Sequence, residues 1–470
     1  MSLPDGPRTP PTLQLIQWIA SPLSFMRNCS ERYGDCFTVS FGDNLSRTVV
    51  FSDPQVLKII LTSDESKEFE APGELNGVLE PLLGAQSVIG LSGDRHRRMR
   101  QLMMPPFHGE RMRSYGELIG DITDEVMRGC IIGKRFLLRK FMQTITLRVI
   151  LRAVFGLEEG LRYEQMERAL ASLLEASSTR LSVGLLYLPI LRQDFGPLSP
   201  WGNFLRKREW IDRLIYDEIM ERRMRKDTTR NDMLTLLMSA HDEAGEALTN
   251  EELRDELMTL LVAGHETTAT ALTWALYWIH KIPEVRQQLL AEVQTVDPSD
   301  HGALSRLPYL NAVCCETLRI YPVGMLTFPR VTTSPVELGG HSLEPGTIVI
   351  GSIYLTHRRK EIYPDPDRFR PERFLERRFS PYEYLPFGGG ARRCIGMAFA
   401  QFEMKLVISR ILSSFELALA DKRSVRPTRR GLTAGPSPVR LVVRDSLPAV
   451  RTRAVNRKEL DRNVAVVPPQ

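Results

Sequence analysis

The chain has 470 residues, of which 43% are hydrophobic and 25% charged, and its formal net charge is +5. This length and composition are sufficient for a large buried core. The basic runs are not interleaved with aromatic residues, which argues against a nucleic-acid-binding protein. The six cysteines form no CxxC pair, so we expect a reducing, cytoplasmic compartment without structural disulfides.

The chain shows no sign of a membrane anchor or of a second domain. The apolar stretch 13–26 is too short to cross a bilayer and is interrupted by Gln14, Gln17 and Pro22. No Pro/Gly/Ser linker and no internal repeat divides the chain, which predicts a single domain over residues 1–444. We also expect a monomer. Residues 445–470 are basic and lack apolar periodicity, and they predict a disordered tail.

The N-terminal elements alternate between helix, hairpin and loop. Asp53 precedes an apolar segment as a helix N-cap. Glycine and proline recur over residues 69–93 and predict a long irregular loop, a feature that is usually functional in compact domains. The other segments predicted here are an extended arm (1–12), helices (13–33 and 53–61) and the strands of a hairpin (37–42 and 48–52).

A basic helix is predicted over residues 93–104. His96 and Arg100 are four residues apart, so they lie on one face and both can donate to the same anionic group. A solvated basic helix explains the same pattern, and the segment alone favours that simpler interpretation.

The middle of the chain is predominantly helical. Residues 115–175 predict two or three helices, and residues 207–240 predict a charged amphipathic helix. Between them, residues 180–206 combine many apolar side chains with glycine and proline, which predicts a mobile apolar connection, or lid.

A long core helix is predicted over residues 249–282. Thr249 and Glu252 form a capping box, and Pro283 follows the end of the helix. Its middle holds the sequence AGHETT (263–268), in which Ala263, Gly264 and Thr267 lie close together on one side. Small residues there would let a flat group approach the helix, but a satisfied polar break in a core helix is an equally good explanation.

The C-terminal third carries further helices and a small sheet. Two helices are predicted over 283–321, short strands up to Leu355, a helix over 395–415 and a hairpin over 431–443. Glu316 and Arg319 are three residues apart and can form an ion pair, which by itself is weak evidence because such pairs are common on solvated helices.

The loop FGGGARRCIG (387–396) holds one cysteine, Cys394, just before an apolar helical run. Small residues allow close approach of the backbone, and a helix N-terminus favours a thiolate. A buried thiolate needs a cation, and one cysteine cannot make a zinc site. The loop therefore predicts a pre-assembled cofactor with an open axial position, and haem iron meets that requirement.

Four motifs in order make the chain resemble the cytochrome P450 family of haem-thiolate monooxygenases. They are AGHETT (263–268), ExxR (316–319), PERF (371–374) and FxxGxRxCxG (387–396). The resemblance extends over about residues 4–443 and is similar to that of soluble bacterial members. It implies a fold that is mainly α with small β-sheets, with haem b between the long central helix and the cysteine loop.

The resemblance also implies roles for individual residues. Cys394 would be the iron ligand, and Glu266 and Thr267 would organise proton delivery to oxygen. Glu316, Arg319 and Arg373 would form a buried charge network that supports the haem-binding core. The other residues implied to contact the cofactor are His96, Arg100, Ala263, Gly264, Arg330, Phe387, Gly388, Arg392 and Gly396.

The implied substrate pocket is mostly apolar, which indicates a fatty acid, a terpenoid or steroid, or a polyketide-like molecule. It would be lined by loop 72–90, segment 180–205 and the residues Leu260, Val262, Ala263, Val323, Met325, Leu326 and Leu432.

The implied reaction inserts one atom of O2 into the substrate with two electrons from NAD(P)H, delivered by a separate ferredoxin or flavodoxin and its reductase. Arginines near the haem motifs, namely Arg97, Arg98, Arg377, Arg378 and Arg393, are candidates for docking that partner. The alternatives are a peroxide-driven peroxygenase or isomerase, and a haem-binding protein without turnover. The presence of both Glu266 and Thr267 argues against a peroxide user.

Overall fold

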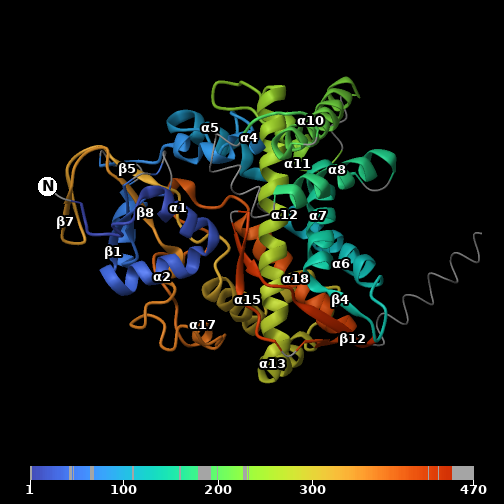
Figure 1. The fold of residues 1–470 in the computed structure, drawn as a ribbon. Helices are drawn as coiled ribbons and strands as arrows, with labels where there is room; N and C mark the ends of the chain where they lie inside the picture. The colour runs from blue at the N-terminus through green and yellow to red at the C-terminus, as the bar shows by residue number, and fades with distance from the viewer. Residues whose placement is uncertain are drawn as a thin grey trace, which may run out of the picture.

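A 32-residue helix, α12 (Asn250–Lys281), runs through the middle of the molecule (Figure 1). The Thr249 side chain accepts from the Glu252 N–H, and the Glu252 carboxylate accepts from the Thr249 N–H at 2.9 Å, which completes the predicted capping box. Most residues of the helix are buried, as its length and apolar content predicted. The computed structural model describes residues 3–41, 45, 47–63, 68–107, 111–157, 160–177, 192–197, 199–225, 230, 232–421, 423–431 and 433–446.

Helices pack along one side of α12, and the largest sheet lies on the other side (Figure 1). Figure 1 shows α6 (Arg111–Met127), α7 (Leu138–Phe155), α8 (Leu161–Ser177) and α10 (Pro200–Arg225) to the right of α12. The helices α15 (Pro308–Ile320) and α18 (Met397–Ser414) also pack against α12. The fold is mainly helical with small sheets, as the sequence predicted.

The largest sheet joins distant parts of the chain. Its five strands lie in the order β1 (Cys36–Val39), β2 (Thr48–Phe51), β8 (Ile348–Gly351), β5 (Arg330–Thr332) and β3 (Phe69–Glu70). The predicted β1–β2 hairpin is confirmed, and β2 pairs in parallel with β8, with Val50 opposite Ile350.

Three smaller sheets complete the β-structure. They are β4 (Arg135–Leu137), β12 (Arg440–Ser446) and β9 (Phe415–Leu419); β10 (Pro427–Arg430) with β11 (Thr433–Pro436); and β6 (Val336–Leu338) with β7 (His341–Leu343). The predicted hairpin over 431–443 is therefore wrong, because β11 pairs back to β10 while β12 pairs with β4 and β9.

The short helical elements fill the connections. They are α1 (Pro11–Ala20), α2 (Pro22–Tyr33), α3 (Pro54–Thr62), η3 (Gly73–Leu79), α4 (Glu80–Leu83), α5 (Gly93–Met103), η4 (Pro105–Phe107), α11 (Met233–Ser239), α13 (Pro283–Val293), α14 (His301–Ser305), α16 (Ile353–Thr356), α17 (Arg373–Glu376) and η6 (Gly390–Arg392).

Several predicted boundaries are wrong for local reasons. The helix predicted over 13–33 is two helices, because Pro22 begins a new one. The loop predicted over 69–93 contains η3 and α4. Much of the predicted lid, 178–191, lies outside the described residues, and α10 already begins at Pro200. Strand β12 reaches Ser446, and the rest of the predicted tail lies outside the described residues.

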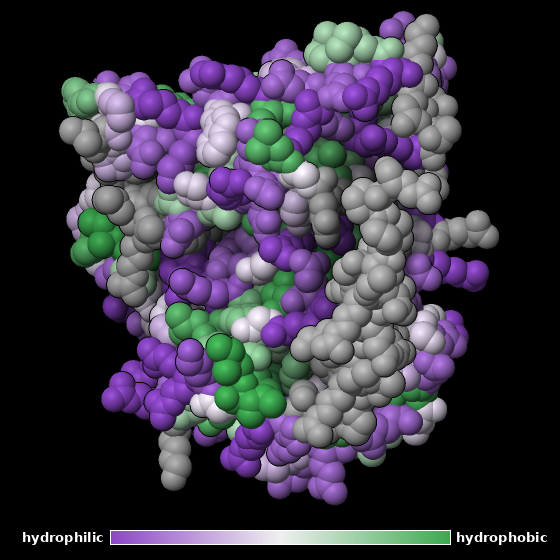
Figure 2. Space-filling model, turned by 90° about the vertical axis from the view of Figure 1, so that its right-hand side faces the viewer, coloured by the Kyte–Doolittle hydropathy of each residue, from purple (hydrophilic) through white to green (hydrophobic). Residues whose placement is uncertain are grey.

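Two apolar clusters hold these layers together. The main cluster joins α12 to the surrounding helices, and a second one packs α1, α2 and β1 against the segment around Met325. Within the described part of the chain, no helix has the length and apolar character needed to cross a bilayer. The face shown in Figure 2 is largely hydrophilic, with apolar side chains in small groups.

Candidate haem-thiolate site

The loop before α18 presents Cys394 through glycines with unusual backbone angles. Gly388 and Gly390 have φ values of 68° and 64°, a region that side chains with a Cβ rarely adopt. The Cys394 N–H donates to the Phe387 carbonyl at 3.0 Å, which closes the loop. Gly396 has an ordinary φ of −81° and room for a Cβ, so the protein itself does not require glycine there.

The Cys394 thiol is surrounded by protein yet remains accessible. Burial raises the pKa of Cys394, whereas the Gly396 N–H and the charges of Arg100 and Arg393 act in the opposite direction and favour the thiolate. A thiolate held this way can be a metal ligand, because the backbone and two cations stabilise its charge and its accessible side leaves room for a metal.

Cations from three separate elements converge beside this loop. Burial lowers the pKa of His96 to about 4, and the next causes are the charges of Arg392, Arg100 and Arg330. Arg392 donates to the carbonyls of Val88 at 3.0 Å and Leu91 at 2.6 Å. His96, Arg100, Arg330 and Arg392, which the resemblance implied as cofactor contacts, are therefore brought together.

The residues present fit haem as a cofactor. Three guanidiniums gathered in a partly buried place favour an anionic group, and haem carries two carboxylates. A single accessible thiolate beside them matches an axial ligand to iron. The donor set is consistent with haem b, which Cys394 and this cation cluster would hold.

The middle of α12 carries the AGHETT residues that the resemblance assigned to the cofactor and to proton delivery. Ala263 is exposed although it lies at the centre of a core helix, and Thr267 is half-buried one turn later on the same face. The Thr267 hydroxyl donates to the Ala263 carbonyl, so its oxygen remains able to accept. Gly264 serves packing as well, because a Cβ there would lie 3.0 Å from Ile150 Cδ1 on α7.

Glu266 is held by two residues of α7 that the sequence did not single out. One carboxylate oxygen accepts from Arg139, and the other accepts from Gln143 Nε2 at 3.1 Å. Arg139 also donates to Thr270 Oγ1 at 3.1 Å. Nothing in the local sequence distinguishes Arg139 from the other basic residues of its segment, so only the packing of α7 on α12 reveals it.

Glu316, Arg319 and Arg373 form one buried network. Arg319 donates to both Glu316 oxygens, at 2.7 and 2.9 Å, and Arg373 Nε donates to one of them at 3.1 Å. All three side chains are almost fully buried. Arg319 also donates to the His357 carbonyl at 2.8 Å, so the network ties α15 to the segments that precede the cysteine loop.

The predicted pocket residues lie in different surroundings. Leu260 lies on α12 about one turn before Ala263, and Val323 packs at the edge of the main cluster. Met325 is buried in the second cluster, and Leu326 packs against that cluster. Val262 also packs against the main cluster, and Leu432 lies outside the described residues.

Three of the arginines predicted to dock a redox partner are engaged in ion pairs within the protein. Arg97 pairs with Asp94, and Arg377 donates to Glu383 at 2.8 Å. Arg98 pairs with Asp242 and donates to Glu252 at 2.9 Å, so it ties α5 to the capping box of α12. Arg393 is exposed beside Cys394.

Known proteins resemble the whole chain. A sequence profile described as "Cytochrome P450" matches residues 4–443. "Putative cytochrome P450 135B1" of Mycobacterium bovis is 38% identical over 91% of this chain and 88% of its own length. "Putative cytochrome P450 135A1" of Mycobacterium tuberculosis is 34% identical over 92% of this chain and 93% of its own.

A solved structure shares the fold. "Retinoic acid bound cyanobacterial CYP120A1" superposes with a TM-score of 0.78 at 24% sequence identity, covering 95% of this chain and all of that one. Together with the profile match, the relatives at 34–38% identity and the thiolate loop, these findings show that the chain belongs to the cytochrome P450 family.

Proposed function

We propose that this P450 monooxygenase oxidises an apolar organic substrate with electrons from NAD(P)H, delivered by a separate ferredoxin or flavodoxin and its reductase. One atom of O2 enters a C–H or C=C bond of the substrate. The other leaves as water, which consumes two electrons and two protons. The observation that supports this proposal most directly is the accessible Cys394 thiol beside four converging cationic or imidazole side chains.

Different residues of the chain would ligate the cofactor, fix its orientation and pack against it. Cys394 would hold haem b, which supplies oxygen activation when bound. His96, Arg100, Arg330 and Arg392 would bind its carboxylates and so fix its orientation. Phe387 and the glycines of the loop would pack beneath it.

Proton delivery would fall to Thr267 and Glu266. The Thr267 hydroxyl oxygen can accept from a water on the Ala263 side of α12, since its proton is donated to the Ala263 carbonyl. Glu266 would have to exchange Arg139 or Gln143 for water before it passes a proton. Arg139 therefore controls how readily Glu266 takes part.

The apolar side chains expected around Ala263 and Leu260 support an apolar substrate. The superposed cyanobacterial structure is named for bound retinoic acid, which has an apolar body and a carboxylate. An amphipathic carboxylic acid is thus within the range of substrates that we propose.

The carbon monoxide complex of the reduced protein tests the core of this proposal. The wild-type holoenzyme should show the red-shifted absorption band of a thiolate-ligated haem, and Cys394→Ala should lose it while keeping its helical circular dichroism. A folded, haem-loaded wild type without the band, or a Cys394→Ala variant that retains it, would contradict thiolate ligation.

A further inference from the structure

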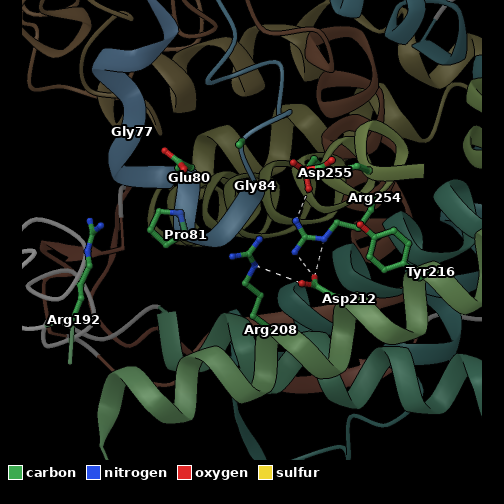
Figure 3. A pocket seen from close by; sticks show the side chains of 12 residues that line it. Gly77, Glu80, Pro81, Gly84, Arg192, Arg208, Asp212, Tyr216, Arg254 and Asp255 are labelled. Atoms are coloured by element: carbon green, nitrogen blue, oxygen red, sulfur yellow. Dashed lines mark hydrogen bonds and ion pairs between the residues drawn. The ribbon is translucent and has the colours of Figure 1, made fainter. Parts of the chain in front are cut away.

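A polar pocket of about 420 Å³ opens between α4, α10 and the first turns of α12, away from Cys394. Figure 3 shows Arg208 extending from α10 toward Pro81 and Gly84, with Asp212 beside it. Its wall is mostly charged or polar rather than apolar. The charged residues that line it are Glu80, Arg192, Arg208, Asp212, Glu251, Arg254 and Asp255.

Two neighbouring arginines of this pocket differ in how they are satisfied. Arg254 donates to Asp212 at 2.8 Å, to Asp255 at 2.5 Å and to the Leu83 carbonyl at 3.2 Å. Arg208 has no hydrogen bond to any residue that the structure describes, and its nearest carboxylate oxygen, on Asp212, is 3.7 Å from Nε. Arg208 Nε is buried without a hydrogen-bond partner and its ion pair with Asp212 is long, so the guanidinium can still bind a ligand.

The charges of the pocket select the kind of anion. The pocket wall carries three arginines and four carboxylates, so a multiply charged anion would be repelled. Asp212 and Asp255 are engaged by Arg254, and Glu80 and Glu251 are exposed. One guanidinium without a hydrogen-bonding partner matches one carboxylate, which it can bind through two parallel hydrogen bonds.

The pocket also lies within the length of an extended acid from the middle of α12. Asp255 in its wall and Ala263 are eight residues apart on α12, about 12 Å along the helix axis. The Val88 N–H donates to Glu256 at 2.6 Å, and Glu256 lies two turns before Ala263 on the same face.

We propose that this pocket binds the carboxylate of an amphipathic acid through Arg208, and that the substrate is therefore an apolar carboxylic acid held at a distance from the oxidised carbon. The inference rests on the proposed function and adds the substrate class to it. Arg208 is in this sense a specificity-determining residue outside the haem site.

The test compares dodecanoic acid with 1-dodecanol, which share an apolar chain and differ in the head group. Holoenzymes of the wild type, Arg208→Gln, Arg208→Lys and Arg213→Gln are titrated, with Kd measured by calorimetry and by the spin-state shift of the haem. Arg213 is the matched control, because it lies on α10 but is 69% exposed and pairs with Glu209.

The wild type should bind the acid at least about ten-fold more tightly than the alcohol, since a charge-assisted hydrogen bond contributes that much. Arg208→Gln should lose this preference with alcohol binding unchanged, Arg208→Lys should keep part of it, and Arg213→Gln should match the wild type.

Three results would overturn the inference: no acid preference in the wild type, equal losses for both ligands in Arg208→Gln, or the same loss in Arg213→Gln. Failure of both ligands to bind would overturn it too. The thiolate band of each holoenzyme separates these outcomes from failure of the proposed function, because that band does not depend on Arg208.

Discussion

At the scale of single residues, Glu266 of the AGHETT motif has hydrogen-bonding partners that the motif did not indicate. Glu266 was expected to serve proton delivery, yet its carboxylate is paired with Arg139 and bonded to Gln143. Burial is the main cause that lowers the pKa of Arg139 to about 10, with the charge of Arg430 adding to it. A partly buried cation of this kind depends on its carboxylate partner.

Replacing Arg139 with Gln should therefore destabilise the protein by about 3 kcal/mol, because it leaves Glu266 without its cation in a mostly buried place. The free energy of unfolding of the holoenzyme in denaturant measures the effect. The control is Arg168→Gln, whose partner Glu164 lies in the solvent, and which should change stability by less than about 1 kcal/mol. Equal losses in the two variants would show that Arg139 is an ordinary surface arginine.

At the scale of elements, the segment between β3 and α5 depends on close contact between the main chain at Gly73 and that at Gly90 and Leu91. The sequence predicted an irregular loop over 69–93, and the structure shows η3 and α4 folded back on residues 87–92. The Gly73 N–H donates to Ser92 Oγ at 2.7 Å. A Cβ at Gly73 would overlap the main chain of Gly90 and Leu91, so glycine is required by the packing.

Gly73→Ala should thus destabilise the protein by about 2 kcal/mol or more, because backbone atoms cannot move aside as a side chain can. It should also weaken haem retention, since Arg392 donates to the carbonyls of Ala71 and Leu91 on either side of this contact. Denaturation midpoints and haem release to apomyoglobin measure the two effects. Gly90→Ala is the matched control, because a Cβ there meets only Ser87 O at 3.7 Å; a loss as large as that of Gly73→Ala would disprove the steric argument.

At the scale of the whole molecule, buried histidines make stability depend on pH. His265 is fully buried in the α12–α7 contact, where its Nδ1 lies 2.8 Å from Thr146 Oγ1, and burial lowers its pKa to about 3. The folded protein keeps His265 neutral while the unfolded chain protonates it below about pH 6.5. Its contribution to stability is therefore present above that pH and is lost as the pH falls toward 3.

Between pH 7 and pH 5, this single group should remove about 2 kcal/mol of stability. In His265→Gln the difference in unfolding free energy between these two pH values should shrink by that amount, because glutamine keeps a polar group beside Thr146 and does not titrate. His241→Gln replaces an exposed histidine and serves as the control, with the wild-type difference expected. An unchanged difference in His265→Gln would mean that His265 is not held neutral by burial.

The local pattern of the chain was sufficient for the parts of the fold that depend on neighbours in sequence. The capping box of α12, the Asp53 cap and the β1–β2 hairpin all depend on interactions between residues close together in the chain, and all are present. The same holds for the Cys394 loop, whose glycines and helix start are encoded locally. The resemblance to a family added the order of the motifs, and with it the roles expected of Cys394 and the cation cluster.

Only the tertiary structure decided how distant segments meet. The strand at 440–446 pairs with residues 135–137 and 415–419, so the predicted terminal hairpin fails because its partner is chosen by packing rather than by a turn. The pairing of Glu266 with Arg139, and the pocket that α4, α10 and α12 form around Arg208, likewise depend on elements far apart in the chain. The sequence by itself determined what Cys394 can ligate, because that chemistry is local; which side chains surround the substrate depends on long-range packing that no local pattern encodes.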